Sequence, residues 1–156
     1  MRIAPALRTH VAGLVELMTG SPLLRRYGVT SGRARASLRE ALREHDVVLV
    51  ALDGGGQTVG LAWVITTRAL DRAAYLRLLL VAEGRQSHGV GAALLAEAER
   101  AARSAGCRHL VLLVTTTNRR ARAFYAREGY RHVGNMPGFV HPAIGESLYV
   151  KSWTAR

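Results

Sequence analysis

The pattern of hydrophobic and polar positions changes from helical to strand-like in the first half of the chain. Apolar residues recur every three or four positions over residues 5–19 and 31–44, which predicts two amphipathic helices. Pro22 interrupts the chain between them and starts a short further turn, and Ser31 is the expected N-cap of the second helix. Short runs rich in Val and Leu then predict three strands, at residues 47–52, 58–67 and 74–81.

The order of the remaining elements indicates a mixed sheet. We expect a helix over 90–105 ended by Gly106, a strand over 109–114, a helix from an Asn118 cap to 127, and strands at 130–133 and 147–153. The strand–helix–strand unit at 74–114 implies a parallel pair, whereas the Asp-Gly-Gly-Gly turn at 53–56 implies an antiparallel hairpin. The sequence therefore predicts an α/β (α+β) fold whose mixed, mostly antiparallel central sheet surrounds a parallel core.

Composition narrows the class of protein. The 156 residues suit one domain over residues 1–156, and 49% hydrophobic with 21% charged residues is typical of a globular chain. Cys107 is the one cysteine, so neither an intramolecular disulfide nor a cysteine zinc cluster can form. We expect a cytoplasmic protein that needs no metal. We also expect neither a signal peptide nor a membrane span, because the apolar runs are too short.

The most informative segment follows the strand predicted at 74–81. It is a loop that leads into a helix, with the sequence Gln86-Ser87-His88-Gly89-Val90-Gly91-Ala92. Glycines at 89 and 91 let backbone N–H groups approach a ligand closely, and a helix N-terminus favours phosphate. The loop lacks the Gly-Lys-Ser/Thr of a Walker A motif, and a Gly-x-Gly turn by itself is often structural.

A second segment downstream makes the functional interpretation of the loop more specific. Asn118 is followed by Phe124-Tyr125 and Gly129-Tyr130, after the strand predicted at 109–114. Together with Gln-x-x-Gly-x-Gly at 86–91, this arrangement resembles the GNAT N-acetyltransferase family, over roughly residues 45–153 and most clearly over 76–130. The resemblance implies a GNAT-like acyl-CoA-binding fold and transfer of an acetyl group from acetyl-CoA to a primary amine.

The resemblance also implies roles for particular residues. Backbone groups of Leu79 and Val81 are expected to face the thioester and pantetheine, and Asn118 to bind the pantetheine arm or hold the splayed strand. The residues expected around the pyrophosphate are Gln86, Ser87, His88, Gly89, Val90, Gly91 and Ala92. Tyr125 occupies the position of a general acid that protonates the departing CoA thiolate, a role that its ordinary pKa near 10 permits.

The base and the acceptor site are less defined. The ribosomal-protein N-terminal acetyltransferases resemble this chain but carry a Glu where Leu113 stands, five residues before Asn118, which counts against that subgroup. No base is assigned. The acceptor pocket is expected between residues 23–30 and a loop at 134–146. In that loop Met136 and Phe139 are candidate lining residues and His141 and Glu146 candidate amine ligands, unless the loop is ordinary surface.

The charge of the chain is strongly positive. Lys and Arg number 22 against 11 Asp and Glu, a formal net charge of +11, which favours an anionic partner. One arginine cluster, at residues 119–131, would lie near an anionic CoA. The other comprises Arg25, Arg26, Arg33, Arg35, Arg39 and Arg43. It is interpreted as a solvated helix face or as a contact for an anionic acceptor such as RNA.

Three functions therefore stay open. The first is an acetyl-CoA-dependent N-acetyltransferase acting on a small molecule or a protein. The second is a non-catalytic acyl-CoA-binding module, and the third is an acetyltransferase for an amine carried by nucleic acid, such as a charged tRNA. Polycationic acceptors are disfavoured by the net charge of +11. The sequence does not decide the acyl-chain preference or whether the protein forms a homodimer.

Overall fold

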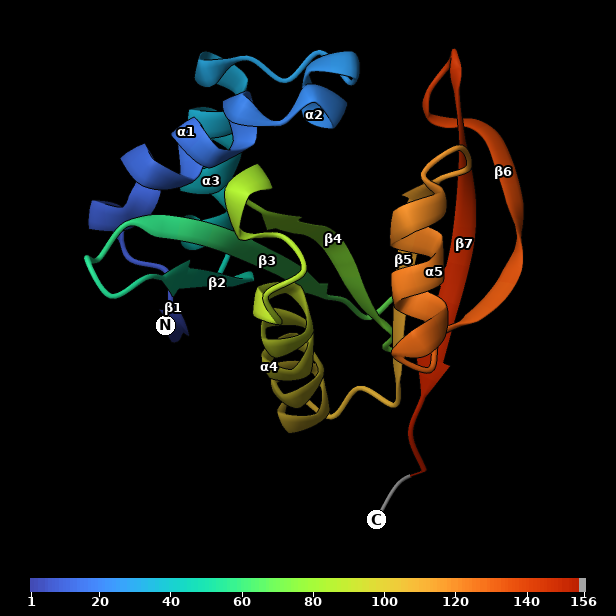
Figure 1. The fold of residues 1–156 in the computed structure, drawn as a ribbon. Helices are drawn as coiled ribbons and strands as arrows, with labels where there is room; N and C mark the ends of the chain where they lie inside the picture. Colours follow the sequence, from blue (N-terminus) through green and yellow to red (C-terminus); the bar gives the residue numbers. More distant parts are fainter. Residues whose placement is uncertain (155–156) are drawn as a thin grey trace.

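The computed structural model of the protein describes residues 1–154 and contains a seven-stranded sheet in the order β1-β2-β3-β4-β5-β7-β6 (Figure 1). The strands are β1 (Arg2–Pro5), β2 (Val47–Leu52), β3 (Thr58–Thr66), β4 (Ala74–Val81), β5 (His109–Thr115), β6 (Arg131–His141) and β7 (Ile144–Ser152). The helices are α1 (Val11–Gly20), α2 (Pro22–Arg26), α3 (Ser31–Arg43), α4 (Val90–Ser104) and α5 (Arg119–Arg127), with short 3₁₀ turns η1 (Arg8–His10) and η2 (Glu83–Arg85).

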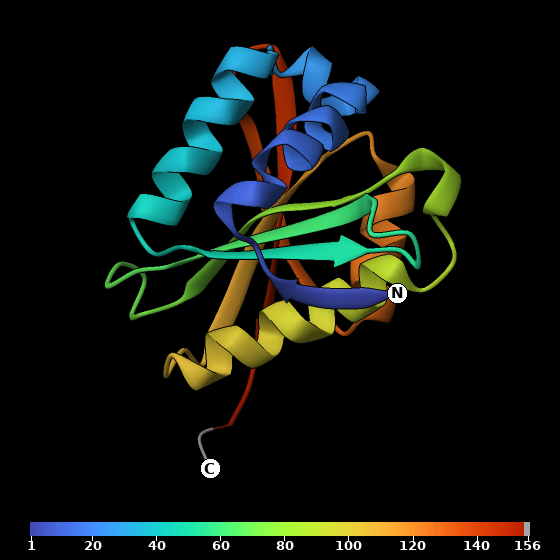
Figure 2. The same cartoon turned by 90° about the vertical axis from the view of Figure 1, so that its left-hand side faces the viewer.

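Helices cover both faces of the sheet (Figure 2). On one face α1 and α3 bury Leu14 and Leu38 against β2 and β3, and on the other α4 buries Leu94. Helix α4 packs closely on β3 because Gly60 has no side chain: a Cβ there would lie 2.7 Å from Leu94 Cδ1. Burying one face of each amphipathic helix on a sheet supplies most of the stabilisation of such a layered domain.

The parallel strands β4 and β5 separate partway along their length. They pair from Ala74↔Leu110 to Leu76↔Leu112, and later residues of β4 have no β5 partner in the described chain. On its other edge β4 stays paired with β3 as far as Val81, after a register shift near Trp63. Figure 1 shows the resulting opening between β4 and β5, beside α5. The backbone of β4 beyond Leu76 therefore has a free edge facing the opening.

The mixed α+β fold is confirmed, with β4 and β5 parallel and the other neighbouring pairs antiparallel. Residues 2–5, however, form the unpredicted strand β1, so the first predicted helix begins later, at η1 and α1. The second helix is capped by Thr30, whose Oγ1 accepts a hydrogen bond of 3.3 Å from Arg33 N, rather than by Ser31.

The prediction of a loop at 134–146 is wrong. Most of this segment belongs to the hairpin of β6 and β7, which turns after His141. The register shifts between Met136 and His141. The sequence predicted the start of β6, at 130–133, but not its continuation to His141, because Gly134, Pro137 and Gly138 are typical turn residues. In the structure they occupy an irregular strand at the edge of the sheet. Among residues 1–154, no helix is long and apolar enough to cross a membrane.

Candidate active site

The loop between β4 and α4 has the backbone of an anion-binding turn. Ser87 and Gly89 both adopt left-handed conformations, with φ of +64° and +79°, and Gly89 is the N-cap of α4. The first helical hydrogen bond within this turn runs from Ala93 N to Gly89 O, at 3.0 Å. The N–H groups of the preceding first turn therefore lack helical partners and can bind an anion, aided by the helix dipole.

Arg120 of α5 fixes this loop from the opposite side of the opening. Its Nη2 donates a hydrogen bond of 2.9 Å to Ser87 Oγ, and its Nη1 donates to Gln86 Oε1. Gln86 Nε2 in turn donates to Val81 O at 3.3 Å, so the loop is joined to the end of β4. His88 is exposed and its Nδ1 lies 2.7 Å from Gln86 O. An exposed guanidinium thus stands beside the free amides of α4.

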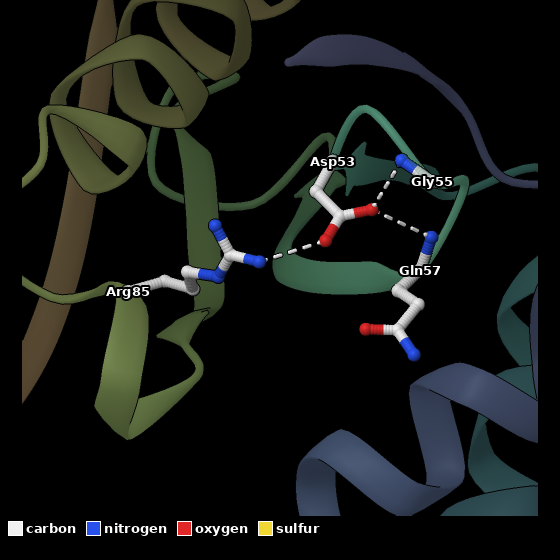
Figure 3. Close-up of polar contacts among 4 residues, drawn as sticks. All are labelled: Asp53, Gly55, Gln57 and Arg85. Atoms are coloured by element: carbon white, nitrogen blue, oxygen red, sulfur yellow. Dashed lines mark hydrogen bonds and ion pairs between the residues drawn. The ribbon is translucent and has the colours of Figure 1, made fainter.

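The β2–β3 hairpin holds the other end of the loop, as Figure 3 shows. Asp53 accepts hydrogen bonds from Gln57 N at 3.0 Å and Gly55 N at 2.9 Å, and forms an ion pair with Arg85 Nη2 at 2.9 Å. The two backbone N–H groups, with the Arg85 guanidinium, hold the pKa of Asp53 below its ordinary value. This charge therefore anchors η2 just before Gln86.

A first cavity of ≈ 1210 Å³ extends along the free edge of β4 and the N-terminus of α4. Its lining includes all of the sequence-predicted cofactor residues except His88 and Val90. The Val90 side chain is buried in the core, leaving only its backbone for a ligand. Arg120 also lines this cavity, although the sequence marked it only as one member of a basic cluster. The predicted phosphate loop and the Asn118 segment are thus brought together around one space.

A second cavity of ≈ 370 Å³ lies beside the first. The residues that line both are Leu23, Leu79, Asn118, Ala121 and Tyr125. Asn118 Oδ1 accepts a hydrogen bond of 3.1 Å from Ala121 N, so this side chain caps α5 while lining both spaces. The cavities therefore meet where β4 and β5 separate.

Tyr125 stands at this meeting point. It is 8% exposed and packs edge-on against Phe124 and Tyr130, with ring centroids 5.1 and 5.6 Å away. Within residues 1–154 its hydroxyl makes no hydrogen bond to protein, and burial raises the pKa of Tyr125 well above its ordinary value. The phenol is therefore neutral at physiological pH and free to donate to a ligand.

The second cavity contains a buried carboxylate, Glu146, which is 3% exposed. Tyr27 Oη donates to Glu146 Oε1, and Thr115 Oγ1 lies 2.7 Å from Tyr27 Oη and donates to it, since the phenol proton is already engaged. Burial and the Glu146 carboxylate raise the pKa of Tyr27 to about 12. Burial likewise raises the pKa of Tyr75, which lines the same cavity. No cation forms an ion pair with Glu146 in the described part of the chain.

Sequence reasoning located the acceptor side only in part. Of the four candidates at 134–146, Glu146 lines the second cavity, while Phe139 is exposed and His141 packs edge-on near Tyr27 with a centroid separation of 6.5 Å. Met136 lies outside the cavity lining. Residues 1–154 hold no cluster of three or more His, Cys, Asp or Glu side chains suited to a metal.

The comparisons with known proteins agree with this architecture. A model of the acetyltransferase (GNAT) family matches residues 17–130. Among curated proteins, none matches the chain. Three solved structures share the fold at low sequence identity. An aminoglycoside 6'-N-acetyltransferase complexed with coenzyme A is 17% identical with a TM-score of 0.83, covering 100% of this chain and 99% of its own.

The ribosomal-protein-alanine N-acetyltransferase of Brucella melitensis is 21% identical, with a TM-score of 0.78, covering 98% of this chain and 100% of its own. A GNAT-family acetyltransferase of Streptococcus pneumoniae is 22% identical, with a TM-score of 0.78 and coverage of 98% and 99%. Because the family model spans well over half of the sequence, the chain belongs to the GNAT family and is an N-acetyltransferase that uses acetyl-CoA.

Proposed function

We propose that this enzyme acetylates the primary amine of a small molecule bound in the second cavity, using acetyl-CoA bound in the first. The observation that carries the proposal is the meeting of the two cavities at Leu79, Asn118 and Tyr125, with the Glu146 carboxylate in the second. Each substrate then reaches the same point from its own side of the sheet opening.

The residues present suit acetyl-CoA in the first cavity. The phosphates would lie against the amides of Gly89 to Ala92, with Ser87 and the Arg120 guanidinium at their side. The pantetheine amides would pair with the free edge of β4 at Leu79 and Val81, as an added strand pairs with a sheet edge. A structural neighbour with the same fold was complexed with coenzyme A, which supports a coenzyme A site in this fold.

The second cavity would supply the nucleophile. A protonated amine must lose a proton before it can attack, and Glu146 with Tyr27 is the polar pair available to hold the ammonium and receive that proton. The N–C bond then forms as the C–S bond breaks, and the nitrogen loses a second proton. Tyr125 gives its phenol proton to the sulfur, which leaves as the thiol, and the second proton lost by the nitrogen restores the Tyr125 phenol.

Binding and turnover test the proposal together. Acetyl-CoA should raise the melting temperature, since a ligand of the native state stabilises it, and an accepted amine should release free CoA thiol. Gly89→Glu, which places a carboxylate in the phosphate turn, should remove the shift. Gly106→Glu is the matched control, because Gly106 also has a left-handed φ, of +83°, and an unobstructed Cβ position. Equal shifts for both variants would contradict the proposed phosphate site.

Other sequence expectations stay predictions. These are a single domain over residues 1–156, a cytoplasmic location, a homodimer and a nucleic-acid-borne acceptor. Membership of an acetyltransferase family favours catalysis over the alternative of a non-catalytic acyl-CoA-binding module.

A further inference from the structure

The charges around the second cavity form no ion pairs within residues 1–154. Its charged lining residues are Glu146, Arg33 and Arg77. None of these forms an ion pair with the others or with another side chain of residues 1–154. A buried carboxylate without a cation is costly, so this arrangement favours a ligand that brings the missing charge.

The carboxylate and the guanidinium groups occupy different depths. Glu146 is buried beside Tyr27 and Thr115, whereas Arg33 and Arg77 are exposed and therefore lie at the mouth. Arg33 Nη1 donates to Gly28 O at 3.3 Å, and the Arg77 guanidinium lies 4.8 Å from the Trp63 ring centroid. Both guanidinium groups are thus held at the cavity, while their remaining N–H donors have no acidic partner in the described part of the chain.

The rest of the lining is mainly apolar and aromatic. It includes Leu24, Val29, Trp63, Tyr75, Leu78 and Val140. The volume of ≈ 370 Å³ is near the lower end of the range for small-molecule sites, about 300–1,000 Å³. A small acceptor with an apolar body therefore suits the space between the inner acid and the outer cations.

We infer that the acceptor is a small zwitterion of the ω-amino-acid class, with its ammonium at Glu146, its carboxylate or similar oxyanion at Arg33 and Arg77, and an apolar or aromatic body between the two charges. The inference rests on the proposed function, because it assigns the acceptor of the same site. The orientation places the amine toward Tyr125, where the two cavities meet. A polycation would place further positive charges against Arg33 and Arg77, which disfavours polyamines and aminoglycosides.

A matched panel of amines tests this assignment. 6-Aminohexanoate, 4-(aminomethyl)benzoate and 4-(2-aminoethyl)benzoate are compared with their amides, with phenethylamine, and with spermidine and kanamycin, by release of free CoA thiol. We expect kcat/KM for the best free amino acid to exceed that for its amide at least tenfold, because the amide lacks the anion. Arg33→Gln and Arg77→Gln should each narrow this ratio, whereas Arg35→Gln, the same charge change on the α3 surface, should leave it intact.

The outcomes separate the two proposals. Thiol release with amides, phenethylamine or spermidine at rates equal to or above those of the free acids overturns the zwitterion assignment and leaves acetyl transfer standing. Thiol release with none of the amines contradicts the proposed small-molecule function. In that case calorimetry with CoA-saturated protein decides the assignment separately. The zwitterion assignment is supported if the free acids bind more tightly than their amides and if Glu146→Gln, but not Glu97→Gln, abolishes this preference. Equal binding of acids and amides, or no binding, overturns the assignment.

Discussion

Arg120 Nη2 donates a hydrogen bond of 2.9 Å to Ser87 Oγ, although 33 residues separate them in the chain. The bond joins α5, which follows β5, to the loop that follows β4. Because β4 and β5 stop pairing after Leu76 and Leu112, this contact holds together two segments that the sheet itself leaves apart. The proposed phosphate site therefore contains residues from both sides of the opening.

Replacing Arg120 should weaken the binding of CoA. Arg120→Gln removes a guanidinium beside the proposed pyrophosphate site and its bonds to Ser87 and Gln86. A hydrogen bond to a charged group contributes about 1.5–3 kcal/mol, so Kd for CoA should rise about tenfold or more. Calorimetric titration measures the change.

Arg119→Gln is the matched control, since Arg119 is exposed, adjacent and outside the cavity lining. S-acetylpantetheine, which carries no phosphate, should bind the Arg120 variant and the parent protein alike. An equal loss of affinity for S-acetylpantetheine would show that Arg120 acts on loop folding and not on phosphate.

Removing the hydroxyl of Tyr125 should slow the reaction and spare the fold. In the described residues this hydroxyl makes no bond to protein, so Tyr125→Phe should leave the melting temperature and the affinity for acetyl-CoA unchanged. General-acid contributions suggest a fall in kcat on the order of 10²-fold. Steady-state thiol release measures it, and an unchanged kcat removes Tyr125 from the acid role.

Tyr130→Phe should show the opposite behaviour. Tyr130 Oη donates a hydrogen bond of 3.1 Å to Glu99 Oε1, which Lys151 Nζ also contacts at 2.8 Å, outside both cavities. Losing this buried bond should lower the free energy of unfolding by about 1 kcal/mol without changing kcat. A fall in kcat at unchanged stability would contradict this division of roles.

The Tyr27–Glu146 contact should make stability depend on alkaline pH. The pKa of Tyr27 rises from 10.0 to about 12 in the folded protein, so folding favours the neutral phenol. Its stabilisation is complete below pH 10.0 and declines as the pH rises toward about 12. In urea titrations across this range, Tyr27→Phe should lose less stability than the parent. An equally steep decline would show that the raised pKa of Tyr27 does not contribute.

The ion pair between Asp53 and Arg85 should hold the proposed phosphate loop in place and should persist in mild acid. Folding lowers the pKa of Asp53 from 3.8, so the ionised form stabilises the fold above that value and is lost as pH falls below it. Asp53→Asn should therefore flatten the fall in melting temperature at acid pH and weaken CoA binding. Asp71→Asn, at an exposed loop position, is the control. Identical acid profiles for Asp53→Asn and the parent would contradict the anchor.

Local signals in the sequence predicted the elements around the proposed cofactor site. Gly89 and Asn118 mark the start of α4 and α5, and both are N-caps in the structure. The loop and the Asn118 segment could be recognised because short-range backbone requirements define them. Strand β1 could not, because its four residues, ending at Pro5, become a strand only through pairing with β2.

The acceptor side depends on contacts between residues distant in sequence. Tyr27 and Glu146 are separated by 119 positions, and no local pattern joins them. Glu146 was visible as one polar residue of a supposed loop, but its burial follows from the β6–β7 hairpin. The role of Arg120 also depends on the fold. In the sequence it cannot be told apart from the neighbouring arginines, and only its position on α5 brings it to the loop.

A crystal structure with acetyl-CoA, or with a non-reacting thioether analogue, tests the central claim most directly. We predict the pyrophosphate at the Gly89–Gly91 amides and Arg120, the pantetheine along β4 at Leu79 and Val81, and the sulfur within hydrogen-bond reach of Tyr125 Oη. The acyl group should then face the cavity that contains Glu146. A CoA whose acyl group points away from that cavity, or whose sulfur is remote from Tyr125, would contradict the proposed active site.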